Sequence, residues 1–465
     1  MTPARFMLPV VLGLSLCGTI AVAQDGEVIS KQYDDGGVYE GTFLNGLQHG
    51  QGTYRLPNGY EYTGTWVEGE IKGDGVARFP NGSVYEGSFS KGKPDGVGKI
   101  VFTDGGTYEG TWVAGKITGQ GVAIYANGVR YEGAFRNAMH HGKGAMTSPG
   151  GYVYDGDWVN GVKEGSGKIT YPDGSVYIGR IAEGLRAGQG KLTMADGLIY
   201  EGTWSGGQID GLGRLSQANG DVYDGELADG RRAGQGKVTY ANGDTYEGAF
   251  ENDQRHGQGT FEGADGYRYV GNWTNGQIEG DGEVTYPDGS VYSGEFLGDL
   301  AHGIGKIVYP DGATYEGDWV NGVIEGEGKA TYTNGLVYVG QFKNARNDGF
   351  GTMTFGDGYK YEGDWRDGQR HGQGTATYSD GTVYTGQFKD GQRDGAGEIV
   401  MADGFRYVGE WQRGEINGFG TATYANGDIY EGQFQKGKRE GQGTMTYVDG
   451  QESSGTWENG ALTDG

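Results

Sequence analysis

Residues 39–61 read YEGTFLNGLQHGQGTYRLPNGYE, and this stretch decides the fold because the chain repeats its pattern every 23 residues. A tyrosine two residues before a glycine opens each copy, from Tyr39 to Tyr430, and Ser453 holds the same place in a shortened last copy. No copy contains an insertion or a deletion. An uninterrupted short period is typical of repeat architectures, in which one small unit is stacked many times.

Each copy carries two strand signals. In the first copy, residues 38–43 alternate so that the ring-bearing residues and the central glycine share one face. The second strand, residues 168–171 in one copy, ends just before an Asp-Gly or Asn-Gly pair that leads into the next copy. Such pairs predict two-residue type I′ turns, which need positive φ at both positions. The connection inside each copy, residues 46–52 in the first, is expected to be longer.

These residues resemble the membrane occupation and recognition nexus (MORN) repeat, whose 23-residue unit runs YEGxFxNGxxxGxGxxxxxxG. Tyr39-Glu40-Gly41-Thr42-Phe43-Leu44-Asn45-Gly46, with Gly50-Gln51-Gly52, matches that unit, and the resemblance extends from about residue 28 to 465. It implies an all-β fold: an elongated, twisted rod made of a single-layer antiparallel meander of about 19 hairpin repeats. For function it implies scaffolds, dimerisation modules and membrane-proximal tethers. The chain looks like an exported, bacterial-type array of this family.

The composition excludes both disorder and a series of ordinary globular domains. The 465 residues include 100 glycines and only 35% hydrophobic residues, too few to fill the cores that this length would otherwise need. Yet the chain has 33 tyrosines, 16 phenylalanines and 9 tryptophans, and disordered segments are poor in aromatic residues. We therefore expect the rings to form an ordered layer.

The N-terminus has the pattern of a secretory signal peptide. Arg5 precedes an apolar stretch at residues 6–20, and Ala21-Val22-Ala23 supplies the small residues of a cleavage site. A lipid anchor on Cys17 is the alternative, and it is disfavoured because Leu16 stands where a small residue is expected. The pattern predicts an exported protein, periplasmic or extracellular.

The expected domain organisation follows from the period and the N-terminal pattern. Residues 1–23 form the signal peptide, residues 24–38 a half-repeat, and residues 39–465 an array of 19 repeats.

The fifth residue of each repeat mostly alternates between phenylalanine and tryptophan, on the face that carries the repeat tyrosine. Since a single sheet has nothing else with which to bury a face, we expect these rings to form the core. The residues expected to carry it are Tyr39, Phe43, Trp66, Trp112, Trp319, Trp365 and Trp411.

A second alternation lies nine residues after the repeat tyrosine, where isoleucine and arginine recur. A regular row of this kind suits an interaction edge for an extended partner or for a second copy of the array. The other interpretation, which we favour, is that these long side chains lie over apolar neighbours with their charges in water. The candidate interaction edge comprises Ile71, Ile117, Arg186, Arg232, Arg255, Ile278, Ile324, Arg393 and Arg439.

The chain shows no motif for catalysis, for a cofactor or for a metal ion. Only His140 and His141 are adjacent among the six histidines, and adjacent strand residues point to opposite faces. No Gly-Lys pair continues as a phosphate-binding loop, and no serine occupies a Gly-x-Ser-x-Gly elbow. We therefore expect no enzyme and no cofactor.

The formal net charge of −25 limits the partners. Nucleic acid is excluded, because its binding proteins need basic patches. Anionic membrane headgroups are disfavoured for the same reason, although a local basic edge could still bind them.

Two functions remain. The favoured one is a non-enzymatic scaffold of the cell envelope that binds protein partners, or itself, through a repeated β-sheet surface. The alternative is an array that binds glycans, cell-wall material or lipid headgroups. Stacking on sugars needs rings on the outward face, and the residue before each repeat tyrosine is never a ring.

Overall fold

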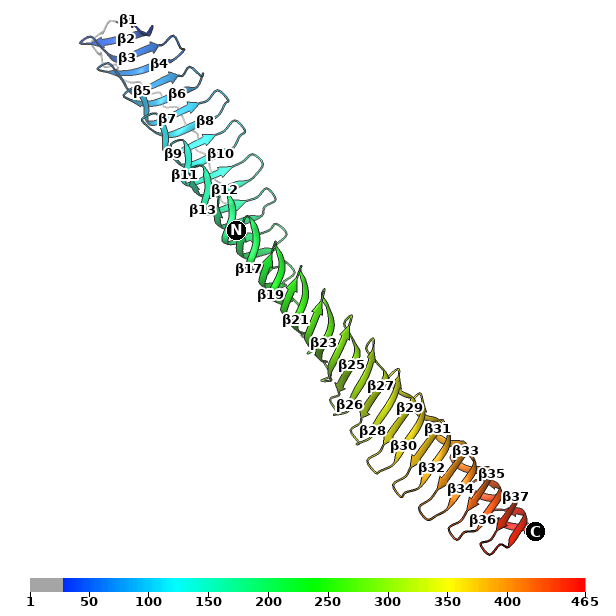
Figure 1. The fold of residues 1–465 in the computed structure, drawn as a ribbon. Helices are drawn as coiled ribbons and strands as arrows, with labels where there is room; N and C mark the ends of the chain where they lie inside the picture. Colours follow the sequence, from blue (N-terminus) through cyan, green and yellow to red (C-terminus); the bar gives the residue numbers. More distant parts are fainter. Residues whose placement is uncertain (1–27, 465) are drawn as a thin grey trace, which may run out of the picture. The chain divides into compact units, whose positions relative to one another are not determined.

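The computed structural model describes residues 28–464, which contain 39 β-strands and no helix (Figure 1). The expected signal peptide over residues 1–23, with Cys17, and the first residues of the 24–38 half-repeat lie outside the described residues.

The contacts divide the chain into two units. The first unit holds described residues up to 196, together with residues 204–207, and the second holds residues 197–203 and those from 208 onward. β16 (Ile199–Ser205) has residues in both. The other strands of the first unit are β1 (Ile29–Gln32), β2 (Val38–Leu44), β3 (Leu47–Arg55), β4 (Glu61–Val67), β5 (Glu70–Arg78), β6 (Val84–Ser90), β7 (Lys93–Val101), β8 (Thr107–Val113), β9 (Lys116–Ile124), β10 (Arg130–Arg136), β11 (Met139–Thr147), β12 (Val153–Val159), β13 (Val162–Thr170), β14 (Val176–Ala182) and β15 (Leu185–Thr193).

The second unit continues the same pattern of short and long strands. Its strands are β17 (Gln208–Ser216), β18 (Val222–Ala228), β19 (Arg231–Thr239), β20 (Thr245–Glu251), β21 (Gln254–Glu262), β22 (Arg268–Thr274), β23 (Gln277–Thr285), β24 (Val291–Leu297), β25 (Leu300–Val308), β26 (Thr314–Val320), β27 (Val323–Thr331), β28 (Val337–Lys343), β29 (Arg346–Thr354), β30 (Lys360–Arg366), β31 (Gln369–Thr377), β32 (Val383–Lys389), β33 (Gln392–Val400), β34 (Arg406–Gln412), β35 (Glu415–Thr423), β36 (Ile429–Gln435), β37 (Lys438–Thr446), β38 (Glu452–Glu458) and β39 (Ala461–Asp464).

Within each unit consecutive strands pair antiparallel, as β2 does with β3, β3 with β4 and β20 with β21. One repeat contributes one seven-residue strand and one nine-residue strand, as β2 and β3 do. The prediction of a single-layer, all-β antiparallel meander of about 19 hairpin repeats is therefore confirmed.

The tight turns lie inside the repeats rather than between them. In the β2–β3 hairpin, Asn45 and Gly46 have φ of 50° and 79°, and Glu68 and Gly69 in the next hairpin have 52° and 87°. Two positive φ values in a two-residue connection are the signature of a type I′ turn. The expectation that these turns form at the Asp-Gly and Asn-Gly junctions between repeats is wrong.

Those junctions form a different turn. Gly59 alone has a positive φ, of 91°, and its N–H donates to the carbonyl of Leu56 at 3.1 Å. Asn58 contributes through its side chain, since its Oδ1 accepts the N–H of Tyr60 at 3.0 Å. Asn or Asp is thus needed here as a hydrogen-bond acceptor, and not for a left-handed backbone.

The nine-residue strand is longer than expected because it contains a β-bulge. Strand β3 pairs with β2 at Gly41–Gly52 and again at Phe43–Gln48, and the register shifts between these pairs. Gly50, at a φ of 79°, lies in the shifted segment. The stretch predicted as a long glycine-rich connection is therefore mostly strand.

A row of paired glycines crosses the sheet beneath the repeat tyrosines. Gly41 pairs with Gly52, Gly52 with Gly64, and Gly64 with Gly75. A Cβ on Gly52 would lie 2.4 Å from the Tyr39 ring, so the ring rests directly on the backbone. A single-layer sheet can therefore bury its tyrosines completely, as it does Tyr39.

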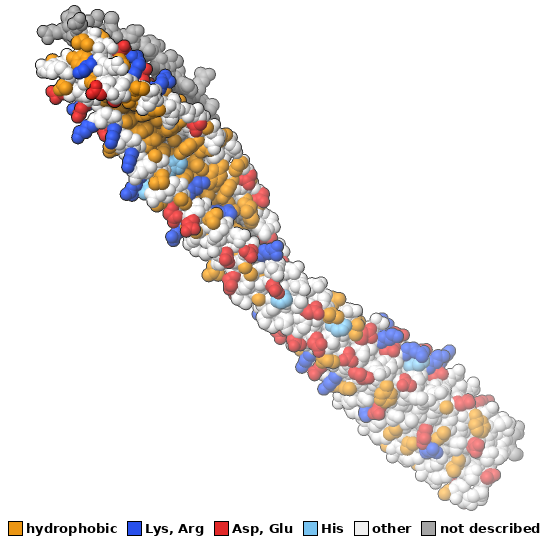
Figure 2. Space-filling model, turned by 45° about the horizontal axis from the view of Figure 1, so that its top comes forward, with side chains coloured by type: hydrophobic (Ala, Val, Ile, Leu, Met, Phe, Trp, Pro, Cys, Tyr) orange, Lys and Arg blue, Asp and Glu red, His pale blue; other side chains and the backbone are white. Residues whose placement is uncertain are grey.

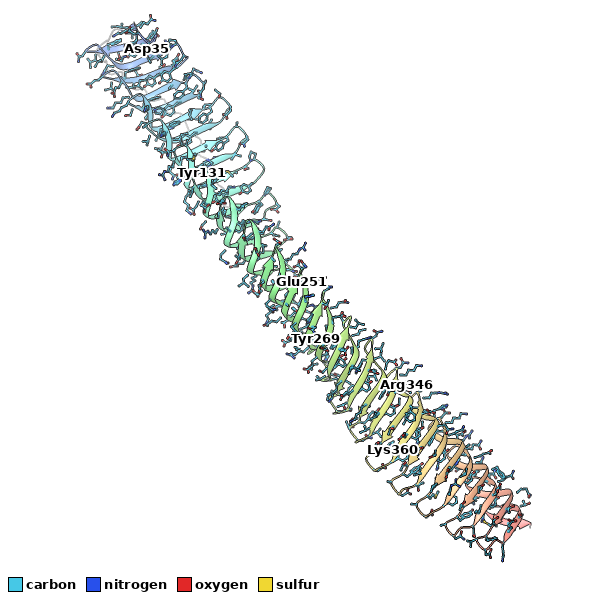
Figure 3. All side chains as sticks on the ribbon, in the orientation of Figure 1. Asp35, Tyr131, Glu251, Tyr269, Arg346 and Lys360 are labelled. Carbon is cyan, nitrogen blue, oxygen red and sulfur yellow. The ribbon has the colours of Figure 1, made fainter. Side chains whose placement is uncertain are left out.

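The rings form long edge-to-face runs in each unit, broken in the first unit where Ile181 takes the place of a ring. In the first unit, the ring of Tyr131, labelled in Figure 3, meets Phe135 of its own repeat at 4.9 Å and Trp158 of the next repeat at 5.4 Å. In the second unit Tyr269 meets Trp273 at 5.3 Å and Phe296 at 5.4 Å. Edge-to-face contacts at these distances are favourable beyond the area that they bury.

Hydrogen bonds join each repeat to the one before it. The indole N–H of Trp66 donates to the carbonyl of Gly52 at 3.3 Å. The tight turn does the same, since the Gly69 N–H donates to the Gln48 carbonyl at 2.9 Å. Each hairpin is thus held by the hairpin that precedes it.

The residues expected to form the core lie in this ring layer. Tyr39, Trp66, Trp112, Trp319, Trp365 and Trp411 are buried. Phe43 differs, because it is only half-buried. Strand β1 pairs with β2 only as far as Gly41, so among the described residues no preceding strand stands opposite Phe43.

Candidate functional site

The candidate interaction edge is not a free edge. Ile71, Ile278 and Ile324 are 8%, 5% and 9% exposed, and Ile117 is half-buried. Ile71 stands directly opposite Trp66 in its hairpin, so the row lies on the face that carries the rings, the ring face. These isoleucines extend the ring layer toward the tight turns.

The arginines of the row cover the rings. The Arg255 guanidinium carbon lies 4.0 Å from the centre of the Trp273 ring, and its Nη2 donates to the carbonyl of Gly276 at 3.2 Å. Cation–π stacking of this kind is favourable at such distances. Each arginine thereby joins its own repeat to a ring and, in most cases, to a turn of the next. The others behave alike: Arg186 over Trp204, Arg232 over Phe250, Arg393 over Trp411 and Arg439 over Trp457.

The sequence reasoning missed a second row of rings, in the junctions between repeats. Tyr60 and Phe79, from successive junctions, lie 6.0 Å apart, and Tyr286 follows Tyr267 at 6.2 Å in the second unit. Part of the signal was present, because the residue 17 positions after the repeat tyrosine, as at Phe79 and Tyr286, is aromatic in most repeats, whereas Tyr60 and Tyr267 stand 21 positions after it. This junction row forms a wall beside the main ring layer.

Between the junction row and the tight turns, the ring face of the first unit is hollowed into a groove of about 590 Å³. Trp66, Ile71 and Trp112 line it from the ring layer, and Phe79 and Pro94 line it from its two sides. We call this the ring-face groove. Figure 2 shows hydrophobic side chains gathered over the N-terminal strands.

No arginine lies among the residues that line the ring-face groove. The row that holds arginine elsewhere has Ile71, Pro94 and Ile117 in three successive repeats here. In the second unit, a comparable space of about 780 Å³ is lined by Arg439 as well as by Ile416 and Phe405. The groove of the first unit is therefore the more apolar of the two.

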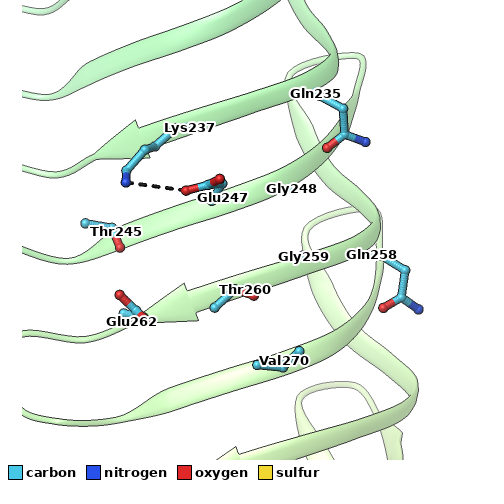
Figure 4. A pocket seen from close by; sticks show the side chains of 10 residues that line it. All are labelled: Gln235, Lys237, Thr245, Glu247, Gly248, Gln258, Gly259, Thr260, Glu262 and Val270. Atoms are coloured by element: carbon cyan, nitrogen blue, oxygen red, sulfur yellow. Dashed lines mark ion pairs between the residues drawn. The ribbon is translucent and has the colours of Figure 1, made fainter.

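The face opposite the rings, the outer face, is polar and has the glycine row as the floor of shallow grooves. Figure 4 shows one of about 550 Å³ over β19–β22, with Gly248 and Gly259 at its base. Lys237 and Glu247 pair across it at 3.4 Å. Two rings, Phe350 and Phe419, are exposed on this face. They lie on nine-residue strands, whereas the sequence argument against outward-facing rings considered only the seven-residue strands.

Two titratable side chains lie among the rings. His140 stacks on Tyr131 at 3.7 Å, its Nε2 lies 2.6 Å from the Tyr125 hydroxyl, and burial lowers its pKa to about 4. Lys163 donates to the Tyr152 hydroxyl at 2.7 Å, and burial lowers its pKa. Both occupy the row that elsewhere holds isoleucine or arginine. Each contacts nearby tyrosines, His140 contacting Tyr125 and Tyr131 and Lys163 contacting Tyr152, which is the behaviour of a packed side chain.

The side chain at the position before the Gly-x-Gly segment, often histidine, accepts a hydrogen bond from a backbone N–H of the next repeat's tight turn. Nδ1 of His302 lies within hydrogen-bonding reach of the Asn321 N–H at 3.4 Å, and Asp394 accepts the corresponding N–H of Arg413 at 3.1 Å. Within residues 28–464 no group of three or more His, Cys, Asp or Glu side chains is placed to hold a metal ion. No helix capable of crossing a membrane occurs over the same range.

The chain resembles several known proteins, either over a short stretch or at low sequence identity. The chain is 45% identical to alsin of Rattus norvegicus over 58 residues, which span 11% of this chain and only 4% of alsin. The TCP domain of Drosophila melanogaster SAS-4, in complex with a proline-rich motif of Ana2, is 14% identical, covering 38% of this chain and 85% of that one, with a TM-score of 0.21. The TCP10 domain of Danio rerio CPAP is 15% identical over 47% of this chain and 93% of that one, at 0.18. Such TM-scores support no argument.

The family match extends over the whole array. The MORN repeat model matches residues 39–59, 62–84, 85–107, 108–130, 131–151, 154–176, 177–199, 200–222, 223–245, 246–266, 269–291, 292–314, 315–337, 338–358, 361–383, 384–406, 407–429 and 430–452. The chain, with its hairpin period and its ring layer, belongs to the MORN repeat family.

Proposed function

We propose that this protein is a non-enzymatic interaction scaffold of the cell envelope, and that its ring-face groove binds an extended apolar segment of a partner protein. The groove itself carries the proposal, because it is an apolar hollow of about 590 Å³ with a single charged residue in its lining. MORN repeats generally serve protein or membrane interaction, which supports a binding role. The envelope location rests on the N-terminal export pattern.

The chemistry of the groove favours an apolar peptide. The indole N–H groups of Trp66 and Trp112 already donate to the carbonyls of Gly52 and Gly98, so they are not available to a polar ligand. Lys93 is the one charged residue among those lining the groove. An extended segment with aliphatic side chains or prolines suits a groove walled by aromatic rings and proline.

A lipid surface fits less well. The side chains at the bottom of the groove are buried, Ile71 among them, and cannot insert into a bilayer. A bilayer needs apolar side chains that project outward, whereas a groove admits a narrow ligand.

The test uses peptide display against the purified full chain. A library of random peptides displayed on phage is selected on the wild-type protein, and the selected peptides are measured against an Ile71→Arg variant. Arg370 shows what the new side chain will do, because it lies over the Phe388 ring and donates to the carbonyl of Gly391. An arginine at 71 has Phe89 and Gly92 at the same offsets, so it would fill the groove without disturbing the repeat.

We expect apolar peptides that bind the wild type and lose at least tenfold in affinity with Ile71→Arg. The control is Val97→Lys, since Val97 is 68% exposed on the outer face, and this variant should bind as the wild type does. Peptides that bind all three proteins alike would contradict the proposal. Retention on insoluble cell-wall polysaccharide, unchanged in Ile71→Arg and without any peptide binding, would establish the glycan alternative instead.

A further inference from the structure

We propose that a cationic groove on the outer face of the first unit binds the acidic outer face of the second unit in another copy of this chain. This contact lies on the opposite side of the sheet from the ring-face groove, and the two proposals can fail separately.

The cationic groove, of about 580 Å³, lies over β11–β15. Its floor is glycine backbone, and Lys143, Lys168 and Arg180 line it together with a single carboxylate, that of Asp155. Lys143 pairs with Asp157 at 2.7 Å. Lys168 and Arg180 are exposed, and neither has an ion pair within residues 28–464. Their charges are therefore available to a ligand of opposite sign.

The acidic counterpart lies on β23–β27. Asp281 stands directly opposite Glu295 in the ladder between β23 and β24, and both are exposed. Like charges in directly opposed positions destabilise a sheet. Glu283, on β23 itself, and Glu327, on β27, add exposed carboxylates on the same face. A cationic partner would relieve this repulsion.

The two units differ in charge along the chain. Residues 28–196 carry 16 Lys and Arg against 18 Asp and Glu, a net charge of −2, whereas residues 197–464 carry 20 against 42, a net charge of −22. A second copy of the chain thus supplies an acidic surface that fits the cationic groove, and no partner of another kind is needed.

The repeat makes the two surfaces match in spacing. Both are faces of antiparallel sheet, in which neighbouring strands lie about 4.8 Å apart. Columns of side chains on one copy therefore recur at the same interval as those on the other. The backbone of the glycine row forms the floor of a groove between two such columns, and a column of the second copy can enter it, as side chains interdigitate between packed sheets.

Salt dependence distinguishes this contact from an apolar one. Two molecules of net charge −25 repel each other over about 30 Å at ~0.01 M salt, but only over about 10 Å at ~0.1 M. Close ion pairs between the faces persist at the second concentration and are screened at ~1 M. Association should therefore be greatest near ~0.1 M and weaker at both extremes.

The experiment is sedimentation equilibrium of the full chain at these three salt concentrations. Since each copy carries both the groove and the acidic face, the average mass should rise with protein concentration, to a dimer if two copies bind reciprocally and beyond it if they bind head-to-tail. The double variant Lys168→Glu/Arg180→Glu and the double variant Asp281→Lys/Glu295→Lys should each stay monomeric. An equimolar mixture of the two should associate again, because the unchanged acidic face of the first variant can bind the unchanged groove of the second.

The control is Arg214→Glu/Lys237→Glu, which makes the same change of charge on the outer face of the second unit. This control should associate as the wild type does. The circular dichroism spectrum of every variant should match that of the wild type. A wild type that is monomeric at all three salt concentrations overturns the proposal. So does association that is equal in the groove variant and the control, or that grows toward ~1 M salt.

Discussion

The ring of Tyr62 lies so close over Gly75 that a Cβ at Gly75 would stand 2.5 Å from its Cε2 atom. The Tyr62 ring is packed in the buried layer, and Gly75 is hydrogen-bonded within the sheet opposite Gly64. Neither can move away without breaking other contacts. Gly75 has no positive φ that would restrict it to glycine. The requirement for glycine is therefore one of space.

Gly75→Ala should lower the free energy of unfolding by about 1–3 kcal/mol, the range for inserting a methyl group into a packed core. Urea unfolding followed by tryptophan fluorescence measures the effect. Gly150→Ala is the control, because a Cβ there meets no atom within 4 Å and the residue has no positive φ. Equal losses in the two variants would show that the ring does not occupy the space above Gly75.

Trp319 separates packing from hydrogen bonding. It is buried between Tyr292 and Tyr315, with ring centres at 5.1 Å and 5.6 Å, and it donates to the carbonyl of Gly305 at 3.2 Å. Trp319→Ala should cost about 3–5 kcal/mol. Trp319→Phe keeps a ring that other repeats use at this position, but it loses the hydrogen bond, about 1 kcal/mol, and part of the indole's packing, so its cost should lie between about 1 kcal/mol and that of Trp319→Ala. A loss below about 1 kcal/mol for Trp319→Ala would mean that the ring is not core.

Ala345 is strained, and its replacement should stabilise the protein. It is the second residue of a type I′ turn, with a φ of 60°. A left-handed backbone costs a residue with a Cβ about 1 kcal/mol relative to glycine, so Ala345→Gly should raise the unfolding free energy by about that amount.

The comparison is Asp299→Gly at the same position of another turn, where φ is 68°. Asp299 Oδ1 accepts the N–H of Ile278 at 2.7 Å, a bond that glycine cannot make. At Asp299 the loss of this hydrogen bond should cancel the stability gained by relieving the backbone strain. The melting temperature should therefore rise for Ala345→Gly and stay nearly unchanged for Asp299→Gly. Stabilisation of both by the same amount would contradict this account of the aspartate.

His140 gives the stability of the first unit a dependence on pH. Its pKa is about 4 in the folded protein because burial disfavours the charged ring, whereas an exposed histidine titrates near 6.5. The contribution of neutral His140 is therefore complete above about pH 6.5 and is lost as the pH falls toward about 4. His140→Gln should flatten this part of the stability profile, while NMR titration of the imidazole should locate the low pKa directly. An imidazole that titrates near 6.5 would contradict the burial of the ring.

The period alone was enough to predict the fold, because every repeat states the same alternation of rings, glycines and polar residues. The faces of the strands and the buried tryptophans followed from that alternation. The turns did not follow, because Asn45-Gly46 and Asn58-Gly59 are the same dipeptide in two different turns. In one of them asparagine adopts a positive φ, and in the other its side chain accepts a hydrogen bond.

The ring-face groove could not be predicted from the residue at any single position of the repeat. It lies where the row has Ile71, Pro94 and Ile117 in place of the arginines that lie over the rings elsewhere. The lack of arginine alone does not predict it, because four successive repeats of the second unit also lack arginine in that row: Ile278, Ala301, Ile324 and Asn347. Whether a guanidinium points into water or stacks on Trp273 is decided by the distance to a ring in the following repeat, which the sequence of one repeat does not contain. The junction rings were detectable, since they recur at a fixed position, but their role as a wall required the fold.

The bonds that each hairpin makes to the hairpin before it give the array a direction. The N–H of Gly69 reaches back to Gln48, and the indole of Trp66 reaches back to Gly52. In a chain that emerges N-terminus first, the residues that accept these bonds are present before the residues that donate them. Each new repeat can therefore fold against the hairpin that precedes it, one hairpin at a time.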